Sequence, residues 1–269
     1  MPIHYELDDE HIVVITFDRP ESRNSADMEH FKLLREAWER FAADDDAWVA
    51  IFTGVDDAFF SGADLRTYIP QVTELKGRMD TEGVDEIDGY RLTDGVKAVL
   101  RGTKIYKPII AAVNGPCTAG GMEMLGGIDL RIACPEATFA VMEPKRGLFA
   151  GGGTTVRLPR QLPFAQAMEL LLCADLVSAE RALEMGLLNA VVPRDELLDK
   201  AYEYARRITV NAPLAVRATK QSVLEGLGMD LRDAYRNEMK ISGIIFATED
   251  AKEGPRAFAE KRPPVWQGR

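Results

Sequence analysis

The sequence has few of the residues that metal sites and histidine-based triads require. It contains three histidines, all within the first thirty residues, and three cysteines. An odd number of widely spaced cysteines without a Cys-x-x-Cys pair fits buried thiols in a reducing compartment better than disulfides or a zinc site. We therefore expect Cys117, Cys134 and Cys173 to be buried structural residues, and we expect no multi-histidine metal centre.

Excess positive charge and long apolar runs are also lacking. The 269 residues include 33 Lys and Arg against 43 Asp and Glu, which gives a formal net charge of −10 at pH 7. This balance argues against a broad surface for nucleic acid. No apolar run reaches the ~20 residues of a membrane helix, and the N-terminus lacks the basic-then-apolar order of a signal peptide. We expect a cytoplasmic protein that binds neither nucleic acid nor membranes.

Apolar strands alternate with helical stretches in the first part of the chain. Strands are predicted over residues 11–17, 48–53, 108–113 and 130–133. Aromatic residues at helical spacing predict a helix over about 26–43, with Asn24 or Ser25 as its N-cap. Such alternation is typical of parallel strands joined by crossover helices. Residues 67–90 interrupt it with an irregular, mixed polar sequence that fits a lid or pocket wall and a mobile surface loop equally well.

Helical patterns dominate after residue 160. They cover about 163–173, 178–186, 194–209, 213–227, 230–246 and 249–261. Ser178 and Thr248 are suitable N-caps for the helices that follow them. We expect a core domain over residues 1–190 and a helical C-terminal region over residues 191–269.

Two glycine-rich turns directly follow predicted strands, at residues 59–65 and 114–121. A strand, a tight glycine turn and then a helix present free backbone N–H groups at the start of the helix. Two such turns can together hold one carbonyl oxygen. Neither Gly-x-Gly-x-x-Gly nor Gly-x-x-x-x-Gly-Lys-Ser/Thr occurs, which argues against a nucleotide site. A hydrolase based on Ser61 is disfavoured because no histidine follows position 30.

Two glutamates, Glu123 and Glu143, each lie beside a glycine-rich turn. Two carboxylates can share the acid and base roles of one proton-transfer reaction, while glycine lets backbone amides approach a ligand closely. This combination indicates lyase chemistry on an activated carbonyl.

Several segments resemble, in order, motifs of the enoyl-CoA hydratase/isomerase family, the crotonase superfamily. They are residues 19–24, 60–64, 107–115, 120–123 and, near the end, 248–254 and 258–262. The ordered set runs through nearly the whole chain. It implies a crotonase-like α/β fold, a spiral of repeated β-β-α units, with a helical C-terminal region that builds homotrimers, often paired as homohexamers.

The resemblance also implies roles for individual residues. The backbone amides of Ala63 and Gly120 would form an oxyanion hole for a thioester carbonyl, and Glu123 and Glu143 match the two catalytic carboxylates of the family. Gly151 aligns with a backbone donor near the reacting water.

Further residues are implied to bind the substrate. The loop from Ala63 through Asp64 and Leu65 to Arg66 would line the acyl-CoA site together with Gly120. Phe258 and Lys261 would reach the adenine and phosphate end of coenzyme A, in this subunit or in a neighbouring one.

The implied activity is that of a hydro-lyase of fatty acid β-oxidation, an enoyl-CoA hydratase that adds water syn to a 2-enoyl-CoA and gives a 3-hydroxyacyl-CoA. Coenzyme A is part of the substrate, and neither a metal nor a redox cofactor is implied. The same superfamily includes double-bond isomerases and hydroxyacyl-CoA dehydratases such as those acting on carnitinyl-CoA, which stay open as alternatives, as does a non-enzymatic acyl-CoA-binding scaffold. Residues 147–154 depart from the usual family pattern, so the sequence leaves the acyl chain open.

Overall fold

Apolar strands form a six-stranded sheet in the computed structural model, which describes residues 2–87 and 89–269. The strand order is β1-β2-β4-β6-β8-β11. β1 pairs with β2 antiparallel, and the other neighbours are parallel. The bounds are β1 Ile3–Leu7, β2 Ile12–Phe17, β4 Val49–Gly54, β6 Ile109–Val113, β8 Leu130–Ala133 and β11 Ala190–Val191. Every residue of β6 is buried, as expected for a parallel strand covered on both faces.

Short strands follow the long ones and form two small sheets. β3 (Ser25–Ala26) pairs with β5 (Gly62–Ala63), and the second small sheet consists of β7 (Cys117–Thr118), β9 (Thr138–Ala140) and β10 (Val177–Ser178). From β2 to β8, each long strand is followed by a short strand and then by a helix. The predicted repetition of β-β-α units is thereby confirmed.

Helices surround the sheet and continue beyond it. They are α1 Met28–Ala43, α2 Tyr68–Glu82, α3 Leu92–Ala98, α4 Gly120–Leu125, α5 Thr154–Gln161, α6 Phe164–Met168, α7 Ala179–Glu184, α8 Leu197–Thr209, α9 Pro213–Gly226, α10 Leu231–Ile245 and α11 Glu249–Glu260. Short 3-10 segments cover Pro20–Ser22, Glu143–Arg146 and Arg194–Glu196, and Glu169–Cys173 is a π-helical turn. Ser178 and Thr248 are N-caps, as predicted. Within the described ranges, no helix has the length and apolar character needed to cross a bilayer.

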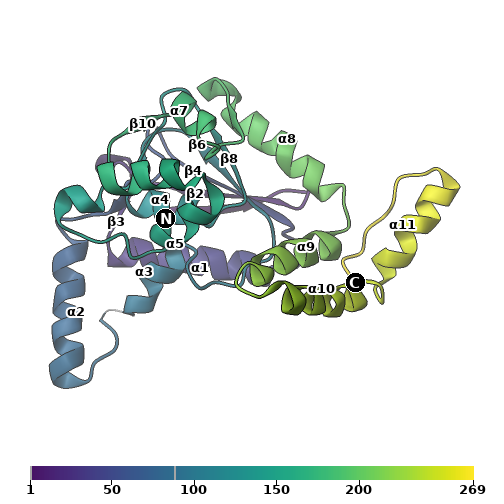
Figure 1. Cartoon of the computed structure of the whole chain (residues 1–269), viewed down its shortest axis with the longest axis horizontal. Helices are drawn as coiled ribbons and strands as arrows, with labels where there is room; N and C mark the ends of the chain where they lie inside the picture. Colours follow the sequence, from purple (N-terminus) through teal and green to yellow (C-terminus); the bar gives the residue numbers. More distant parts are fainter. Residues whose placement is uncertain (1, 88) are drawn as a thin grey trace.

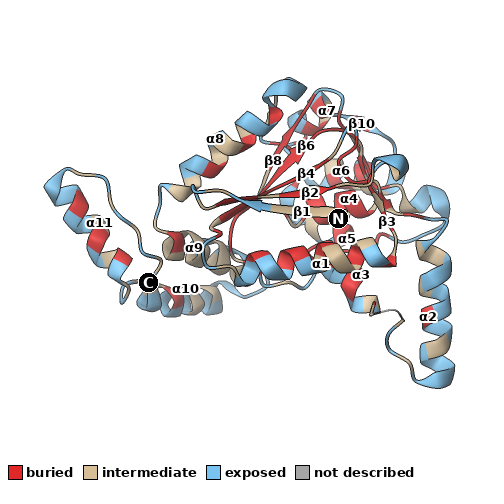
Figure 2. Cartoon of the chain, turned by 180° about the vertical axis from the view of Figure 1, so that it is seen from behind, coloured by how far each residue is buried: buried red, intermediate tan, exposed pale blue. Residues whose placement is uncertain are grey.

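The hydrophobic core lies around the sheet, whose central strands β2, β4, β6 and β8 are mostly buried, whereas the edge strand β1 is partly exposed (Figure 2). α8 packs on β4, β6 and β8 through its buried face, so the core continues past residue 190. α9, α10 and α11 extend toward one end of the molecule, and α2 projects at the other end (Figure 1). The predicted domain boundary at residue 190 stays a prediction.

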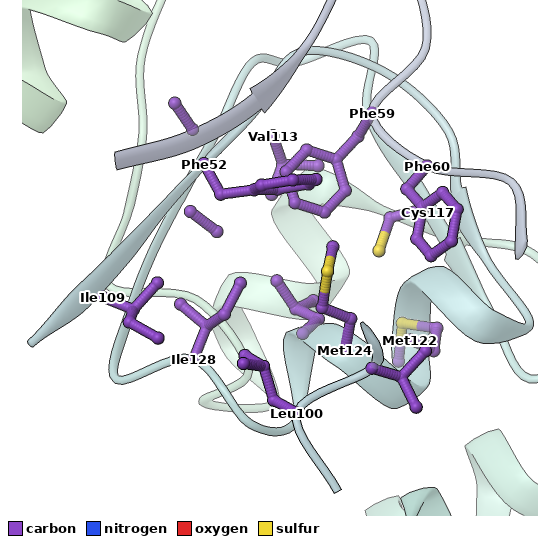
Figure 3. Close-up of a cluster of buried hydrophobic side chains, with 14 of the residues drawn as sticks. Phe52, Phe59, Phe60, Leu100, Ile109, Val113, Cys117, Met122, Met124 and Ile128 are labelled. Atoms are coloured by element: carbon purple, nitrogen blue, oxygen red, sulfur yellow. The ribbon is translucent and has the colours of Figure 1, made fainter. Parts of the chain in front are cut away.

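Cys117 contributes to a close-packed part of this core, beside Phe60 and Met122 (Figure 3). Cys117 and Cys134 are buried, as expected. The expectation is wrong for Cys173, which is exposed, because it ends the π-helical turn at the surface.

The prediction of an irregular segment over 67–90 is wrong for most of its length. Residues 68–82 form α2, and Leu75 is the buried residue of this helix. Because a single buried position leaves no apolar stripe, the helical period is not visible in the sequence. Asp88, at the end of the segment, lies outside the described residues.

The predicted N-cap of α1 is also wrong. The cap is Asp27, whose side chain accepts a hydrogen bond from the backbone amide of His30. Asn24 is fully buried and instead fixes the loop after β4, because its Nδ2 donates to the carbonyls of Val55 (3.1 Å) and Ala58 (2.7 Å). This loop leads directly to β5, so Asn24 helps to position the first glycine-rich turn.

We predict that Asn24→Ala lowers the free energy of unfolding by about 2–4 kcal/mol, because it leaves buried backbone groups without partners. Urea denaturation followed by circular dichroism measures the change. Glu21→Ala, at an exposed site of the same turn, serves as the control and should change stability by less than about 1 kcal/mol. Equal effects of the two substitutions would contradict the anchoring role of Asn24.

Candidate active site

One cavity brings together both glutamates and the glycine-rich turns. Its volume is about 530 Å³, and its lining includes Ala63, Gly120, Glu123, Glu143 and Gly151. These are the five residues predicted to be catalytic. They come from β5, α4, the 3-10 segment Glu143–Arg146 and the loop before α5, so residues far apart in sequence face the same space.

The two glycine-rich turns lie against each other. A Cβ atom on Gly62 would lie 2.6 Å from the backbone nitrogen of Gly120, and a Cβ atom on Gly120 would lie 3.0 Å from Cα of Gly62. The same added atom on Gly120 would lie 3.8 Å from the backbone nitrogen of Ala63. The amides of Ala63 and Gly120 are therefore neighbours, and only residues without a side chain fit at positions 62 and 120.

The second turn leads directly into a helix, as predicted, but the first does not. Gly120 is the first residue of α4, so its amide has no acceptor within the helix. Ala63 lies in β5, and α2 begins five residues later, at Tyr68. Ala119, between β7 and α4, has φ 50° and ψ −115°, a strained conformation for a residue with a side chain. Strained backbone of this kind is concentrated at ligand-binding and catalytic sites.

Glu123 lies in the first turn of α4 and is held from the opposite wall of the cavity. The backbone amide of Gly152 donates a hydrogen bond to its Oε1. Burial raises the pKa of the Glu123 carboxyl, while this hydrogen bond and the guanidinium group of Arg157 act against the rise. Glu123 thus has a fixed orientation and a partly compensated charge.

Glu143 has no comparable support. Its Oε2 is buried and has no hydrogen-bond partner in the described part of the chain. Burial raises the pKa of Glu143 from its ordinary value of 4.5 to about 7, and the charge of Glu123 adds to the rise. The influence of one carboxylate on the other means that they titrate as a coupled pair.

Three supporting residues were missed by sequence reasoning. Arg157 Nη1 donates to the backbone carbonyls of Glu123 (2.8 Å) and Val99 (3.1 Å), which ties α5 to the end of α4. Arg101 donates to the carbonyl of Gly151, and Gly152, next to the predicted Gly151, supplies the amide that binds Glu123. Only the run of three glycines at 151–153 pointed to this region, because an arginine that binds carbonyls has no sequence signature.

The predicted substrate-binding residues fall into two groups. Ala63, Leu65 and Gly120 line the cavity, whereas the buried side chain of Asp64 forms an ion pair with Arg19 at 3.3 Å and Arg66 is largely exposed. Asp64 thus stabilises the loop from within.

Phe258 and Lys261 do not line this cavity. They belong to α11 and its C-cap, at the end of the molecule opposite α2 (Figures 1 and 2). A role for them in the site of a neighbouring subunit stays a prediction.

Comparisons with known proteins match the whole chain to one family. A family model described as enoyl-CoA hydratase/isomerase matches residues 8–269. The chain is 40% identical over 261 residues to the enoyl-CoA hydratase EchA19 of Mycobacterium tuberculosis, covering 96% of this chain and 94% of that protein. It is 39% identical over 269 residues to an (E)-benzylidenesuccinyl-CoA hydratase of Thauera aromatica, covering 100% of both. The crystal structure of an enoyl-CoA hydratase from Bacillus anthracis superposes with a TM-score of 0.89 at 30% identity, covering 100% of both chains.

Because Oε2 of Glu143 is buried without a hydrogen-bond partner among the described residues, we predict that the stability of the folded protein depends on pH. Because folding raises the pKa of Glu143 from 4.5 to about 7, the folded state binds this proton more tightly than the unfolded state. The resulting stabilisation is present below about pH 4.5 and is lost as the pH rises through about 7. Between pH 5 and pH 8 the wild type should therefore lose about 1–3 kcal/mol of unfolding free energy relative to Glu143→Gln.

Urea denaturation at both pH values, at one protein concentration, measures this difference. Glu74→Gln, on the exposed face of α2, is the matched control and should follow the wild type. Parallel pH dependences of the wild type and Glu143→Gln would show that Glu143 is not the titrating group.

Proposed function

This chain belongs to the enoyl-CoA hydratase/isomerase family, and we propose that it is a hydro-lyase that adds water syn to the double bond of a 2-enoyl-CoA thioester, giving a 3-hydroxyacyl-CoA. The observation that carries the proposal is the convergence, on one cavity, of two neighbouring backbone amides and two partly buried carboxylates. Similarity along the whole chain to proteins named as CoA-thioester hydratases supports the thioester as substrate.

In this proposal the amides of Ala63 and Gly120 bind the thioester oxygen. Water adds to the conjugated double bond only if the negative charge that develops on this oxygen is stabilised. Preorganised amides provide that stabilisation without rearrangement, and one such donor typically contributes ~10²–10³ in rate. The donors belong to the backbone, so their directions depend on the glycines at 62 and 120 and not on side-chain identity.

The two glutamates differ in ways that favour different proton roles. Glu123 is oriented by an amide and lies near cationic guanidinium groups, which favour its ionised form as the base that takes a proton from water. Oε2 of Glu143 is buried without a hydrogen-bond donor, and burial raises the pKa of Glu143 to about 7, so a substantial fraction of this carboxyl is protonated near neutral pH and can deliver a proton to the α-carbon. Because the pair is coupled, the proton can also be shared between them.

We further propose that the chain assembles into a homotrimer or homohexamer. α10 and α11 expose large apolar side chains, with Met239 75%, Phe246 80% and Phe258 87% exposed. Exposed apolar groups of this size usually mark an interaction surface. Assembly would cover them and would bring Phe258 and Lys261 toward the site of another subunit.

The test of the activity is substitution of each glutamate. Glu123→Gln and Glu143→Gln should each reduce the hydration rate by about 10²–10⁴-fold while leaving thioester binding largely unchanged, because only proton transfer is lost. Loss of the conjugated chromophore reports the rate, and Glu74→Gln is the control for replacing a glutamate by glutamine.

The mass of the product decides between the possible reactions: hydration adds one water, a dehydratase removes one water from a hydroxyacyl-CoA, and an isomerase leaves the mass unchanged. Wild-type rates in either variant, or thioester binding without any turnover, would refute the hydratase.

The assembly is tested by light scattering. We expect a mass of three or six times the 29.8 kDa of the chain. Phe246→Asp should lower it, since a charge at this site opposes burial. Leu183→Asp, an equivalent exchange on α7, is expected to leave it unchanged. A wild type with the mass of a single chain would rule out the proposed assembly.

A further inference from the structure

A pair of tyrosine hydroxyls lies at the wall of the same cavity, close enough to Glu123 for its charge to act on Tyr68. Tyr68 is the first residue of α2 and lines the cavity. Tyr90, just before α3, is 1% exposed and lies behind it, and the two Oη atoms are 2.9 Å apart. Both tyrosines belong to the part of the molecule where α2 projects from the core (Figure 1).

Gly95 shows how tightly this pair is enclosed. A Cβ atom on Gly95 would lie 2.6 Å from Oη of Tyr68 and 2.7 Å from Oη of Tyr90. Gly95 itself lines the cavity, so both hydroxyls lie directly behind its backbone at the cavity surface. Any larger residue on α3 at this point would occupy the space of the hydroxyl pair.

The pair has one hydroxyl proton more than its internal hydrogen bond uses. Two hydroxyls provide two protons, and the contact of 2.9 Å takes one of them. Tyr90 is the buried partner, and a buried donor without an acceptor is costly, so the favourable arrangement has Tyr90 donating to Tyr68. The proton of Tyr68 is then directed to the cavity. Burial raises the pKa of Tyr68, so this hydroxyl is a neutral donor at physiological pH.

Apolar side chains surround the ring of Tyr68, while Lys76 and Glu123 are charged groups in the lining of the same cavity. The ring centroid of Tyr68 lies 4.7 Å from that of the buried Phe31, and Ile69, Val96 and Val99 line the same wall. A single hydroxyl donor on an apolar wall discriminates between ligands that carry an acceptor at that position and ligands that do not.

We propose that Tyr68 is a specificity-determining residue that donates a hydrogen bond to an oxygen on the acyl group, so that the cavity selects CoA thioesters whose acyl group combines an apolar body with an oxygen substituent. This inference rests on the proposed function only in taking a CoA thioester as the ligand of the cavity. It assigns no proton-transfer role to Tyr68.

The experiment measures binding, so it does not depend on turnover. The probes are saturated, unreactive acyl-CoA thioesters from butanoyl to octanoyl, each paired with its terminally hydroxylated analogue, and calorimetry gives the dissociation constants. The wild type should bind at least one hydroxylated thioester about three- to tenfold more tightly than its partner, which is the effect of one neutral hydrogen bond. Tyr68→Phe should abolish this preference while keeping the affinity for the plain thioester.

Tyr90→Phe is the matched control, because it removes the same atom from the buried member of the pair. It should retain the preference, since the donor of Tyr68 is left in place. The inference is overturned if the wild type shows no preference at any chain length, if the preference survives in Tyr68→Phe, or if Tyr68→Phe weakens both members of each pair equally. Hydration of 2-enoyl-CoA without a binding preference would support the proposed function and refute the role of Tyr68. A binding preference without hydration would support the role of Tyr68 and refute the hydratase activity.

Discussion

The contact between the backbones at Gly62 and Gly120 is the constraint on which the candidate site depends. A side chain on either residue would collide with the other turn, at 2.6 Å from the Gly120 nitrogen or 3.0 Å from the Gly62 Cα. The β-β-α repeat makes this approach possible, because β4 and β6 are neighbours in the sheet and each is followed by a short strand that turns toward the same side. The fold therefore places two backbone amides together, and the absence of side chains allows them to face one ligand.

The same close packing determines the electrostatics of the glutamates. Glu123 lies three residues after Gly120, in the first turn of α4, so the helix fixes its position relative to the Gly120 amide. A Cβ atom on Gly152 would lie 2.1 Å from Oε2 of Glu123. Because glycine has no Cβ atom, the Gly152 amide can approach the carboxylate and donate a hydrogen bond to it. Glu143 comes from a separate 3-10 segment and has no such donor at Oε2, and burial raises its pKa to about 7 although a hydrogen bond from its own backbone acts against the rise. Two residues of one type thereby acquire different acidities from their positions alone.

Sequence reasoning located the parts of the structure that local patterns encode. Short, mainly apolar segments predicted β2, β4, β6 and β8, and Ser178 and Thr248 were correctly identified as caps, since an N-cap bond is made within three residues. Features that depend on distant contacts were not visible. α2 lacks an apolar stripe, and Asn24 has the side chain of an N-cap but is used by the loop after β4, thirty-one and thirty-four residues away.

The same distinction applies to the site. Ala63, Gly120, Glu123, Glu143 and Gly151 came from motifs, and the structure brings all five to one cavity. Arg157, Gly152 and the Tyr68–Tyr90 pair were missed, because their contacts join segments that no motif connects. Arg157 and Gly152 hold Glu123 and its helix in place, and the tyrosine pair lies at the wall of the cavity. α2 is anchored in the core by Leu75, with Tyr68 and Val72 packed against the core, and most of its other positions are exposed and can change at little cost to the fold. Relatives of about 40% identity along the whole chain carry names with different acyl groups, enoyl and benzylidenesuccinyl. The proposed chemistry uses backbone held in place where the turns at Gly62 and Gly120 meet, whereas the proposed selectivity uses a wall to which the largely exposed helix α2 contributes.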